Sequence, residues 1–371
     1  MNVSRQALAI VGFSLVSLSG FAQQPFASPP ATGQTQVRPA NSPDAANRLV
    51  LDVVVTEKSG KAVSGLEAKD FTVLDNGHPQ NVLSFRAVKR TTANVTAAED
   101  SPQVIVLVDE VNTNFDRVSY ERDQIKKFLM QNGGALAYST SLAFFTDTKT
   151  EIQNTTSRDG NALMAIFDEH MTALRTSRRS QGFYGAVERW QLSLTAMRSL
   201  AVNGTHAPGR KIVVWISPGW PLLSGPGVEL SPKEQANLFA TITALSKVLR
   251  DARMTVYSID PVGAEAGARS ERFYYREFLK PVTAVKKAEP GTLALQVLAT
   301  HSGGLALSAS NDITAQIEQC VADVDVYYTL TIDTAPAERP DEYHAIDVKV
   351  ATPGLTARTR SGYYVQPVGP L

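Results

Sequence analysis

Short apolar runs alternate with amphipathic stretches through the middle of the chain. VIVLVD (104–109) and KIVVWIS (211–217) are almost continuous apolar runs, which is typical of strands buried on both faces of a parallel sheet. After the first run, apolar residues recur near one helical face: Val118, Ile125, Phe128 and Leu129. Strands separated by helices of this length predict right-handed crossovers and a doubly wound, mostly parallel α/β sheet.

Both ends of this α/β block have a β-type pattern instead. Residues 48–90 contain Asp75-Asn76-Gly77, a strong hairpin signal, because Asn and Gly tolerate the positive φ that tight hairpin turns require. Residues 325–365 include HAIDVKV, in which apolar and polar positions alternate. The N-terminal strands are too few to have a core of their own. We therefore predict that 48–90 and 325–365 pair in one small β-sandwich module, with the α/β domain of 102–322 inserted in it or flanked by it.

The first 22 residues have the pattern of a secretory signal peptide. Arg5 supplies a positive charge, ALAIVGFSLVSL an apolar centre, and GFA the small residues before a cleavage site after Ala22. The apolar stretch is short for a transmembrane helix, so cleavage is favoured and a retained anchor is the alternative. Residues 23–47 are rich in Pro, Ala, Gln and Ser, which predicts a disordered linker. We expect an exported protein, periplasmic or extracellular, with no membrane span after signal cleavage.

The overall composition narrows the classes of partner. The 371 residues are 43% hydrophobic and 19% charged, and 36 basic residues balance 36 acidic ones. A neutral chain offers no electrostatic attraction for nucleic acid or for an anionic membrane. Cys320 is the only cysteine, so no internal disulfide forms, and its helix-like surroundings predict a small core residue. The five histidines are scattered without metal-ligand spacing, so a zinc site is not supported.

Candidate chemistry begins where the first apolar run ends. Asp109 and Thr113 follow a strand that delivers the chain to the carboxyl edge of the sheet, where open α/β sheets bind ligands. Such residues hold a metal ion, take part in a reaction, or hydrogen-bond to their own loop. The last reading is favoured from the residue types, because Asp and Thr commonly cap the turn and helix that follow them.

Five stretches in this order resemble the von Willebrand factor A domain family, in the form of the VWFA-related proteins of the acidobacterial type. They are GLEAKDFTVLDNGHPQNVLSF, VLVDEVNT, RKIVVWISPGW, LATHSGGLALSASND and RTRSGYYV, and the resemblance covers most of residues 48–365. It implies a Rossmann-like fold that binds a partner rather than catalysing a reaction, often through a metal-ion-dependent adhesion site. Three loops at the carboxyl edge of the sheet would hold Mg²⁺ there through oxygen ligands, with a partner's carboxylate in the open position.

The residues depart from this family pattern. The first loop resembles Asp-x-Ser-x-Ser only at its outer positions, Asp109 and Thr113, because Val111 replaces the middle hydroxyl. In the third loop, Ser217 and Pro218 stand where the family has an acid. The second loop offers Thr176, Ser177 or Ser180 without a way to choose among them. The resemblance therefore implies a degenerate site with no cofactor or weakly bound Mg²⁺, and its candidate ligands are Asp109, Thr113, Asn112, Ser180 and Ser217.

Two further features of the carboxyl edge suggest partner contacts. The loop SPGWPLLSGPG (217–227) carries Trp220, Leu222 and Leu223, which would anchor a partner if exposed; the alternative is a lid packed on its own domain. Asp147 and Asp260 also end apolar strands, and they predict either an acidic rim or the start of turns. The predicted partner-binding residues are Trp220, Leu222, Leu223 and Asp260.

These features favour an exported, non-catalytic protein-binding protein of the adhesion or assembly type. One alternative is a metal-assisted, phosphatase-like hydrolase using Asp109, because DEVNT also resembles the nucleophile loop of haloacid-dehalogenase-type phosphatases. That chemistry needs a second acid where Val111 stands. Another alternative is a purely structural component of an envelope assembly. No catalytic residue is predicted, and the sequence identifies neither the protein partner nor the oligomeric state.

Overall fold

The structure is a computed structural model, and it describes residues 6–7, 47–89, 102–113, 115–153, 155–172, 182–223, 228–261, 270–308 and 310–367. The predicted signal peptide and linker lie outside these residues, except for Gln6, Ala7 and Asn47. Gln6 and Ala7 form β1, which pairs in parallel with β11 (Val228–Glu229). Among the described residues, no helix has the length and apolar character needed to cross a membrane.

One seven-stranded sheet forms the centre of the α/β domain. Its strand order is β13-β12-β10-β6-β7-β8, and β9 also pairs with β7. The first five strands are parallel, whereas β8 and β9 run antiparallel to β7. The strands are β6 (Gln103–Asp109), β7 (Ala135–Phe145), β8 (Thr150–Ile152), β9 (Ser157–Asp159), β10 (Lys211–Ile216), β12 (Met254–Ile259) and β13 (Ala306–Leu307). This mixed α/β, parallel-rich sheet agrees with the sequence pattern.

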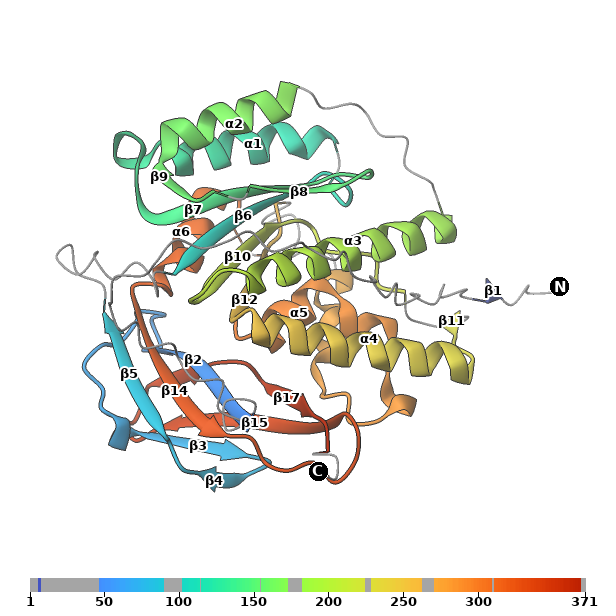
Figure 1. Cartoon of the computed structure of the whole chain (residues 1–371). Helices are drawn as coiled ribbons and strands as arrows, with labels where there is room; N and C mark the ends of the chain where they lie inside the picture. The colour runs from blue at the N-terminus through green and yellow to red at the C-terminus, as the bar shows by residue number, and fades with distance from the viewer. Residues whose placement is uncertain are drawn as a thin grey trace, which may run out of the picture.

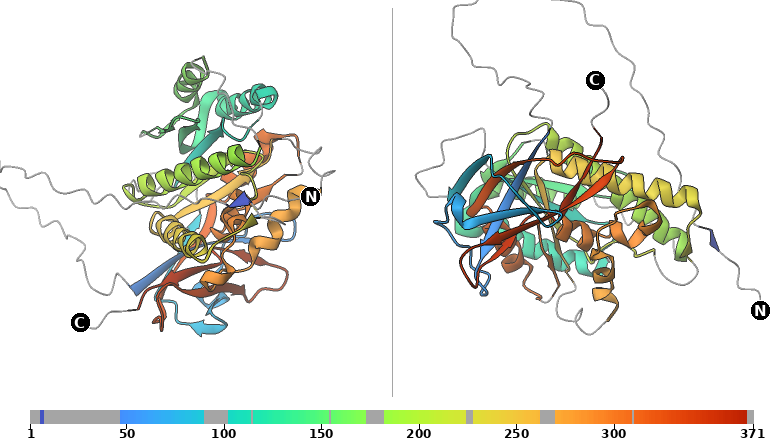
Figure 2. Two further views of the ribbon diagram at one scale, coloured as in Figure 1. Left: turned by 90° about the vertical axis from the view of Figure 1, so that its right-hand side faces the viewer. Right: turned by 90° about the horizontal axis from the view of Figure 1, so that it is seen from below.

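Helices cover both faces of the sheet (Figures 1 and 2). One face packs against α1 (Phe115–Leu129), α2 (Gly160–Thr172) and α6 (Ile313–Ala322), and Cys320 lies fully buried in this core as predicted. The other face packs against α3 (Gly182–Thr205), α4 (Pro232–Asp251) and α5 (Leu295–His301). The short 3₁₀ helices are η2 (Ala68–Asp70), η4 (Gln131–Gly134), η6 (Ser270–Leu279), η7 (Val285–Lys287) and η8 (Pro290–Leu293).

Local sequence signals explain where two elements begin or turn. The side chain of Ser231 accepts a hydrogen bond from the backbone of Glu234, and the side chain of Glu234 accepts one from the backbone of Ser231. Helix α4 therefore begins with a capping box, and it has Pro232 at its first position. The turn between β3 (Phe71–Asp75) and β4 (His78–Gln80) has φ of 48° at Asn76 and 83° at Gly77. The predicted hairpin at Asp75-Asn76-Gly77 is confirmed.

Two four-stranded antiparallel sheets face each other below the α/β domain in Figure 1. Their strand orders are β16-β2-β14-β5 and β17-β15-β3-β4. The strands not yet defined are β2 (Arg48–Thr56), β5 (Ser84–Lys89), β14 (Val326–Asp333), β15 (Glu342–Val350), β16 (Thr356–Arg358) and β17 (Gly362–Val365). Apolar side chains of β2, β3, β14 and β15 fill the space between the sheets, with Phe71, Phe85 and Tyr328 in mutual ring contact.

Each of these sheets contains strands from both ends of the described chain. β14 pairs with both β2 and β5, and β15 pairs with β3. Lys89, at the end of β5, lies opposite Val326, at the start of β14. The chain therefore leaves the sandwich for the α/β domain and returns to it at one pair of neighbouring residues.

Buried ion pairs connect the sandwich to the α/β domain. Arg358 on β16 pairs with Asp323, which follows α6, and also donates to the carbonyl oxygen of Gly303. The hydroxyl of Tyr257 donates to the same carboxylate of Asp323 at 2.6 Å. Arg253, just before β12, binds Asp52 on β2 through two hydrogen bonds of 2.6 and 3.3 Å. Because these groups are largely removed from water, losing one partner leaves a charge without compensation.

We expect Arg358→Met to destabilise the full chain by about 3 kcal/mol, because it leaves the Asp323 carboxylate buried without its cation. Denaturant unfolding measures the loss. The exposed strand residue Lys349 supplies the control, and Lys349→Met should change the unfolding free energy by less than about 0.5 kcal/mol. Equal effects of the two changes would show that the Arg358 pair contributes nothing to the connection between the domains.

Candidate functional site

The candidate site lies where two neighbouring strands send their connections to opposite faces of the sheet. Val108 of β6 is in register with Ile216 of β10. The next residues, Asp109 and Ser217, therefore lie side by side at the carboxyl edge. The helix after β6, α1, packs on one face, and the helix after β10, α4, packs on the other. Open α/β sheets bind ligands at such a switch point.

Asp109 is fully buried and accepts four hydrogen bonds from the protein. Its Oδ1 accepts from the backbone N–H groups of Val111 and Asn112, at 3.0 and 2.8 Å. Its Oδ2 accepts from Asn112 Nδ2 at 2.9 Å and from Trp215 Nε1 at 3.0 Å. Burial raises the pKa of Asp109, whereas the hydrogen bonds from Asn112 and Trp215 and the nearby Ser217 hydroxyl oppose that rise. The carboxylate orders its own loop with donors that a metal ion or a substrate would have to displace.

The rest of the loop is also tied into the domain. Asn112 Nδ2 donates a second hydrogen bond, 2.9 Å long, to Ser193 Oγ on α3. The side chain of Val111 is buried in the core shared with α3 and α4. The position at which the family pattern needs a hydroxyl ligand is therefore occupied by an apolar side chain that contributes to packing.

The other candidate metal ligands are only partly assembled. Thr113 and Ser217 are both buried at this edge, and Ser217 Oγ accepts a 3.1 Å hydrogen bond from the backbone of Gly219. Ser180 lies outside the described residues, as do Thr176 and Ser177. No group of three or more His, Cys, Asp and Glu residues in the described part of the chain has a geometry that could hold a metal ion. The described oxygens favour loop order over cation binding.

A buried acid that the sequence did not single out lies beside this loop. Glu121 on α1 is 1% exposed, and its burial raises its pKa well above 4.5. The neighbouring carboxylates of Asp109 and Asp260 raise it further, while the Thr113 hydroxyl opposes the shift. The sequence contains a clue to this burial in the helical spacing. Glu121 lies four residues before Ile125, a core residue of α1, and so shares its buried face.

The acids predicted to form a rim do not lie together at the surface. Asp260 is 4% exposed and close enough to Glu121 to affect its pKa, so it is not a surface residue. Asp147 is exposed in the hairpin turn between β7 and β8. The prediction that Asp260 belongs to an exposed acidic rim is wrong, because the strand end and its neighbours cover that side chain.

The aromatic loop is also packed inward. Trp220 and Leu223 are each 4% exposed, and Leu222 packs against a small cluster around Phe278. The ring of Trp220 meets Trp215 edge-on at 5.3 Å, and Gln296 of α5 donates to the backbone of Pro218. The expectation that this loop exposes its aromatic residue is wrong: it is a lid held on its own domain by apolar contact.

A histidine bridge is the second feature that the sequence analysis missed. The ring of His170 on α2 stacks on Phe144 at 3.7 Å. Its two nitrogens each lie 3.1 Å from a carboxylate, that of Glu151 on β8 and that of Glu110, which follows Asp109. The three residues are far apart in sequence, so no spacing signal connects them. The bridge ties α2 to the loop after β6.

Comparison with known proteins gives only a loose likeness. No protein-family model and no curated protein matches the chain. Similar solved structures include human COPII-coat protein Sec24c, with 9% identity, a TM-score of 0.32, and coverage of 72% of this chain and 44% of that one. The pilus adhesin SpaC from Lactobacillus rhamnosus GG has 11% identity and a TM-score of 0.34, covering 81% and 43%. The SpRpn10 VWA domain has 14% identity and a TM-score of 0.26, covering 60% and 96%.

The chain thus spans less than half the length of Sec24c and SpaC. TM-scores this low do not establish a common fold. They assign neither a family nor a function to this chain.

Trp215 and Trp220 form a matched pair for testing the loop around Asp109. Trp215→Phe removes the N–H donor to Asp109 and should cost about 1.5–3 kcal/mol of unfolding free energy, the usual contribution of a hydrogen bond to a charged group. Trp220 Nε1 makes no hydrogen bond within the described residues, so Trp220→Phe should cost less. Chemical denaturation followed by circular dichroism measures both. A smaller loss for Trp215→Phe than for Trp220→Phe would contradict the role given to this bond.

Glu121 should give the protein a distinctive pH dependence. Its folded pKa lies above the unfolded value of about 4.5, so the folded state binds more protons between those two pKa values. Its contribution to stability is complete below pH 4.5 and is lost as the pH rises towards the folded pKa, by up to about 1.4 kcal/mol per pH unit. We expect Glu121→Gln to remove this decline and to be more stable than the parent at pH 7. Denaturant unfolding from pH 4 to 8 tests this, and parallel curves for the two proteins would contradict it.

Proposed function

We propose that this chain is an exported, non-catalytic binding protein of the adhesion or assembly type. Its partner is another protein, which it contacts at the carboxyl edge of the α/β sheet. The observation that carries the proposal is the state of Asp109, whose two oxygens accept four hydrogen bonds from Val111, Asn112 and Trp215. The most prominent acid of the site is committed to structure.

Catalysis is the weaker reading of the same residues. A phosphatase-like mechanism needs a carboxylate free to attack and a second acid two residues later to move the proton. Asp109 is saturated with donors, and Val111 is an apolar core residue at the second position. Glu121 is close by, but its side chain is 1% exposed and therefore not accessible to a substrate. No described observation favours the hydrolase over the binding protein.

The adhesion site is degenerate in this proposal. Mg²⁺ prefers a shell of hard oxygens and keeps its water where protein oxygens are few. An ion at this edge would have to displace the N–H donors of Asp109 and take its remaining oxygens from Thr113 and Ser217. We infer that Mg²⁺ binds weakly or not at all, and that the partner is held without a metal.

An exposed aromatic residue offers a contact that the buried loop does not. α3 has 24 residues and is about 36 Å long, whereas the six-residue β10 spans about 20 Å. The N-terminal end of α3 therefore extends past the carboxyl edge, as Figure 1 shows. Tyr184 lies there with 78% of its surface exposed and its ring edge-on to Phe183. Exposed tyrosines are frequent anchors in protein interfaces.

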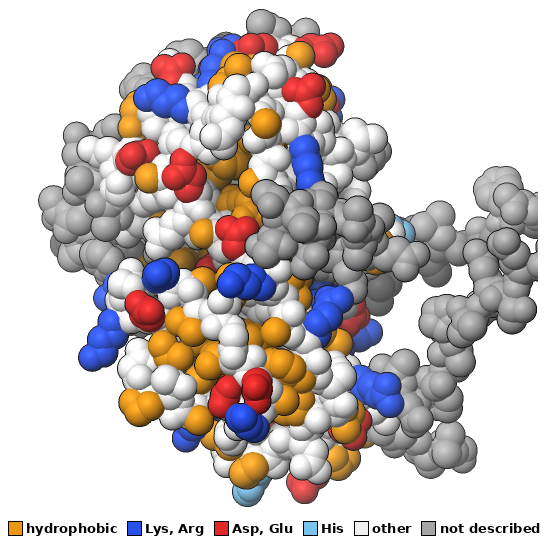
Figure 3. Space-filling view, turned by 90° about the vertical axis from the view of Figure 1, so that its left-hand side faces the viewer, with side chains coloured by type: hydrophobic (Ala, Val, Ile, Leu, Met, Phe, Trp, Pro, Cys, Tyr) orange, Lys and Arg blue, Asp and Glu red, His pale blue; other side chains and the backbone are white. Residues whose placement is uncertain are grey.

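The surface charges favour a protein over a polyanion as the partner. On the face opposite the carboxyl edge, acidic and basic side chains are interspersed, and apolar atoms gather over the sandwich (Figure 3). Basic and acidic residues are equal in number over the whole chain. Neither a purely structural component nor a binding protein needs a strongly charged surface. The two functions are therefore distinguished by whether a single surface residue is required to capture a partner protein.

Partner capture tests the proposal. The purified chain is used as bait in an envelope extract, in buffer containing either Mg²⁺ or a chelator, and captured proteins are quantified by mass spectrometry. We expect Tyr184→Ala to lower the yield of the main captured protein about tenfold or more, since interface tyrosines often contribute above 1.4 kcal/mol. The yield should be the same with Mg²⁺ and with chelator.

Tyr120→Ala is the matched control, because Tyr120 is also exposed, at 38%, but lies on α1 on the other face of the sheet. Equal capture by all three proteins would mean that this edge is not the contact. Loss of capture in chelator, together with saturable Mg²⁺ binding in calorimetry that Asp109→Ala abolishes, would show a working metal site and overturn the metal-free reading.

A further inference from the structure

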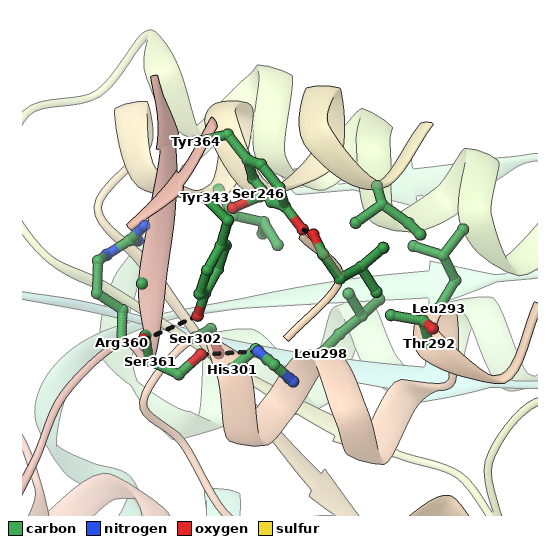
Figure 4. Close-up of a pocket in the computed structure, with 14 residues that line it drawn as sticks. Ser246, Thr292, Leu293, Leu298, His301, Ser302, Tyr343, Arg360, Ser361 and Tyr364 are labelled. Atoms are coloured by element: carbon green, nitrogen blue, oxygen red, sulfur yellow. Dashed lines mark hydrogen bonds between the residues drawn. The ribbon is translucent and has the colours of Figure 1, made fainter. Parts of the chain in front are cut away.

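A cavity lies between the two domains, away from the carboxyl edge (Figure 4). Helices α4 and α5 form one wall, and strands β15 and β17 of the sandwich form the other. In Figure 4, Arg360 stands at one side, Thr292 and Leu293 at the other, and His301 and Ser361 meet between them. Ligand sites occur preferentially at such domain interfaces.

The cavity is small and mainly apolar. Its volume is about 60 Å³. One water needs roughly 10–15 Å³ on this measure, so about four to six water-sized groups fit. Leu249, Leu298 and Tyr364 supply much of the wall. A compact ligand with a short hydrocarbon part suits this space, because apolar side chains supply much of its wall.

The charge in the wall is positive and unbalanced. Arg360 lines the cavity, and no Asp or Glu does. Within the described residues, Arg360 makes no hydrogen bond and no ion pair. The two acids whose charges act on Arg360 are each paired with another arginine, Asp52 with Arg253 and Asp251 with Arg250. Burial, followed by the charge of Arg250, lowers the pKa of Arg360 to about 10, and the charges of Asp52 and Asp251 oppose that shift, so it stays protonated at neutral pH.

The polar groups near Arg360 favour a ligand that accepts hydrogen bonds over one that donates them. Ser361 Oγ and His301 Nδ1 share a 2.7 Å hydrogen bond, and the Tyr343 hydroxyl donates to the Ser361 carbonyl at 2.9 Å. Burial lowers the pKa of His301, so the imidazole is neutral and brings no second charge. The Ser246 hydroxyl lines the cavity without a hydrogen bond to any described residue, and it is free to donate.

We propose that this cavity binds a short-chain carboxylate of two to four carbons. The guanidinium of Arg360 pairs with the carboxylate, a geometry that supplies two parallel N–H donors. The hydrocarbon part lies against Leu249, Leu298 and Tyr364. The site goes beyond the proposed function, because it lies at the domain interface and shares no residue with the carboxyl edge.

Calorimetric titration of the full chain with sodium propionate tests the site, with propionamide as the neutral molecule of matching size. We expect one propionate per chain with a Kd of about 1 mM or tighter, within the limit for so small a ligand. Propionamide should bind about tenfold or more weakly, because it cannot form the charged pair. Equal binding of the two molecules, or no saturable propionate binding, would overturn the proposal.

Two variants locate the binding. Arg360→Gln should weaken propionate binding by about 10- to 100-fold, whereas Arg339→Gln, at an exposed arginine outside the cavity, should leave it unchanged. Ser246→Leu keeps the charge but fills the cavity, and it should abolish binding. Circular dichroism checks the fold of each variant, and Ser246→Leu decides the matter if Arg360→Gln does not fold. Full propionate affinity in a folded Ser246→Leu protein would place the binding elsewhere.

Discussion

The hydrogen-bonded pairing of β5 with β14 is the constraint on which the two-domain arrangement depends. Lys89 and Val326 face each other in that ladder, so the whole α/β domain begins and ends at one place on the sandwich. Neither β-segment forms the sandwich alone, because β14 also pairs with β2 and β15 pairs with β3. The sandwich core is therefore completed only when chain from both ends is present.

The same arrangement decides which edge of the parallel sheet is available. Arg210 and Arg253 stand just before β10 and β12, at the amino edge, and both reach into the sandwich: Arg210 lies over the ring of Tyr327 at 4.6 Å, and Arg253 binds Asp52. The amino edge is thus covered by the second domain. The carboxyl edge keeps the loops that α/β sheets use for recognition, and there the hydrogen bonds of Asp109 make the first loop a rigid support.

The helices and strands were easier to predict from the sequence than the surroundings of individual side chains. The apolar runs that became β6 and β10, the cap at Ser231 and the turn at Asn76 are all local signals, because each depends on residues a few positions apart. The state of Trp220 depends on Trp215 and Gln296, which no local pattern connects to it. The sequence placed Glu121 on one face of a helix, but it did not show whether that face is buried. The position of Arg360 in a cavity wall depends on how the two domains pack, which no local pattern predicts.

Buried charge at the domain interface also explains why the two domains keep one relative position. Arg358 and Arg253 have carboxylate partners on the opposite domain. Such pairs add little net stability compared with apolar contacts, but sliding one domain would separate several of them at once. The interface therefore has one favourable register, and a cavity within it keeps a defined shape.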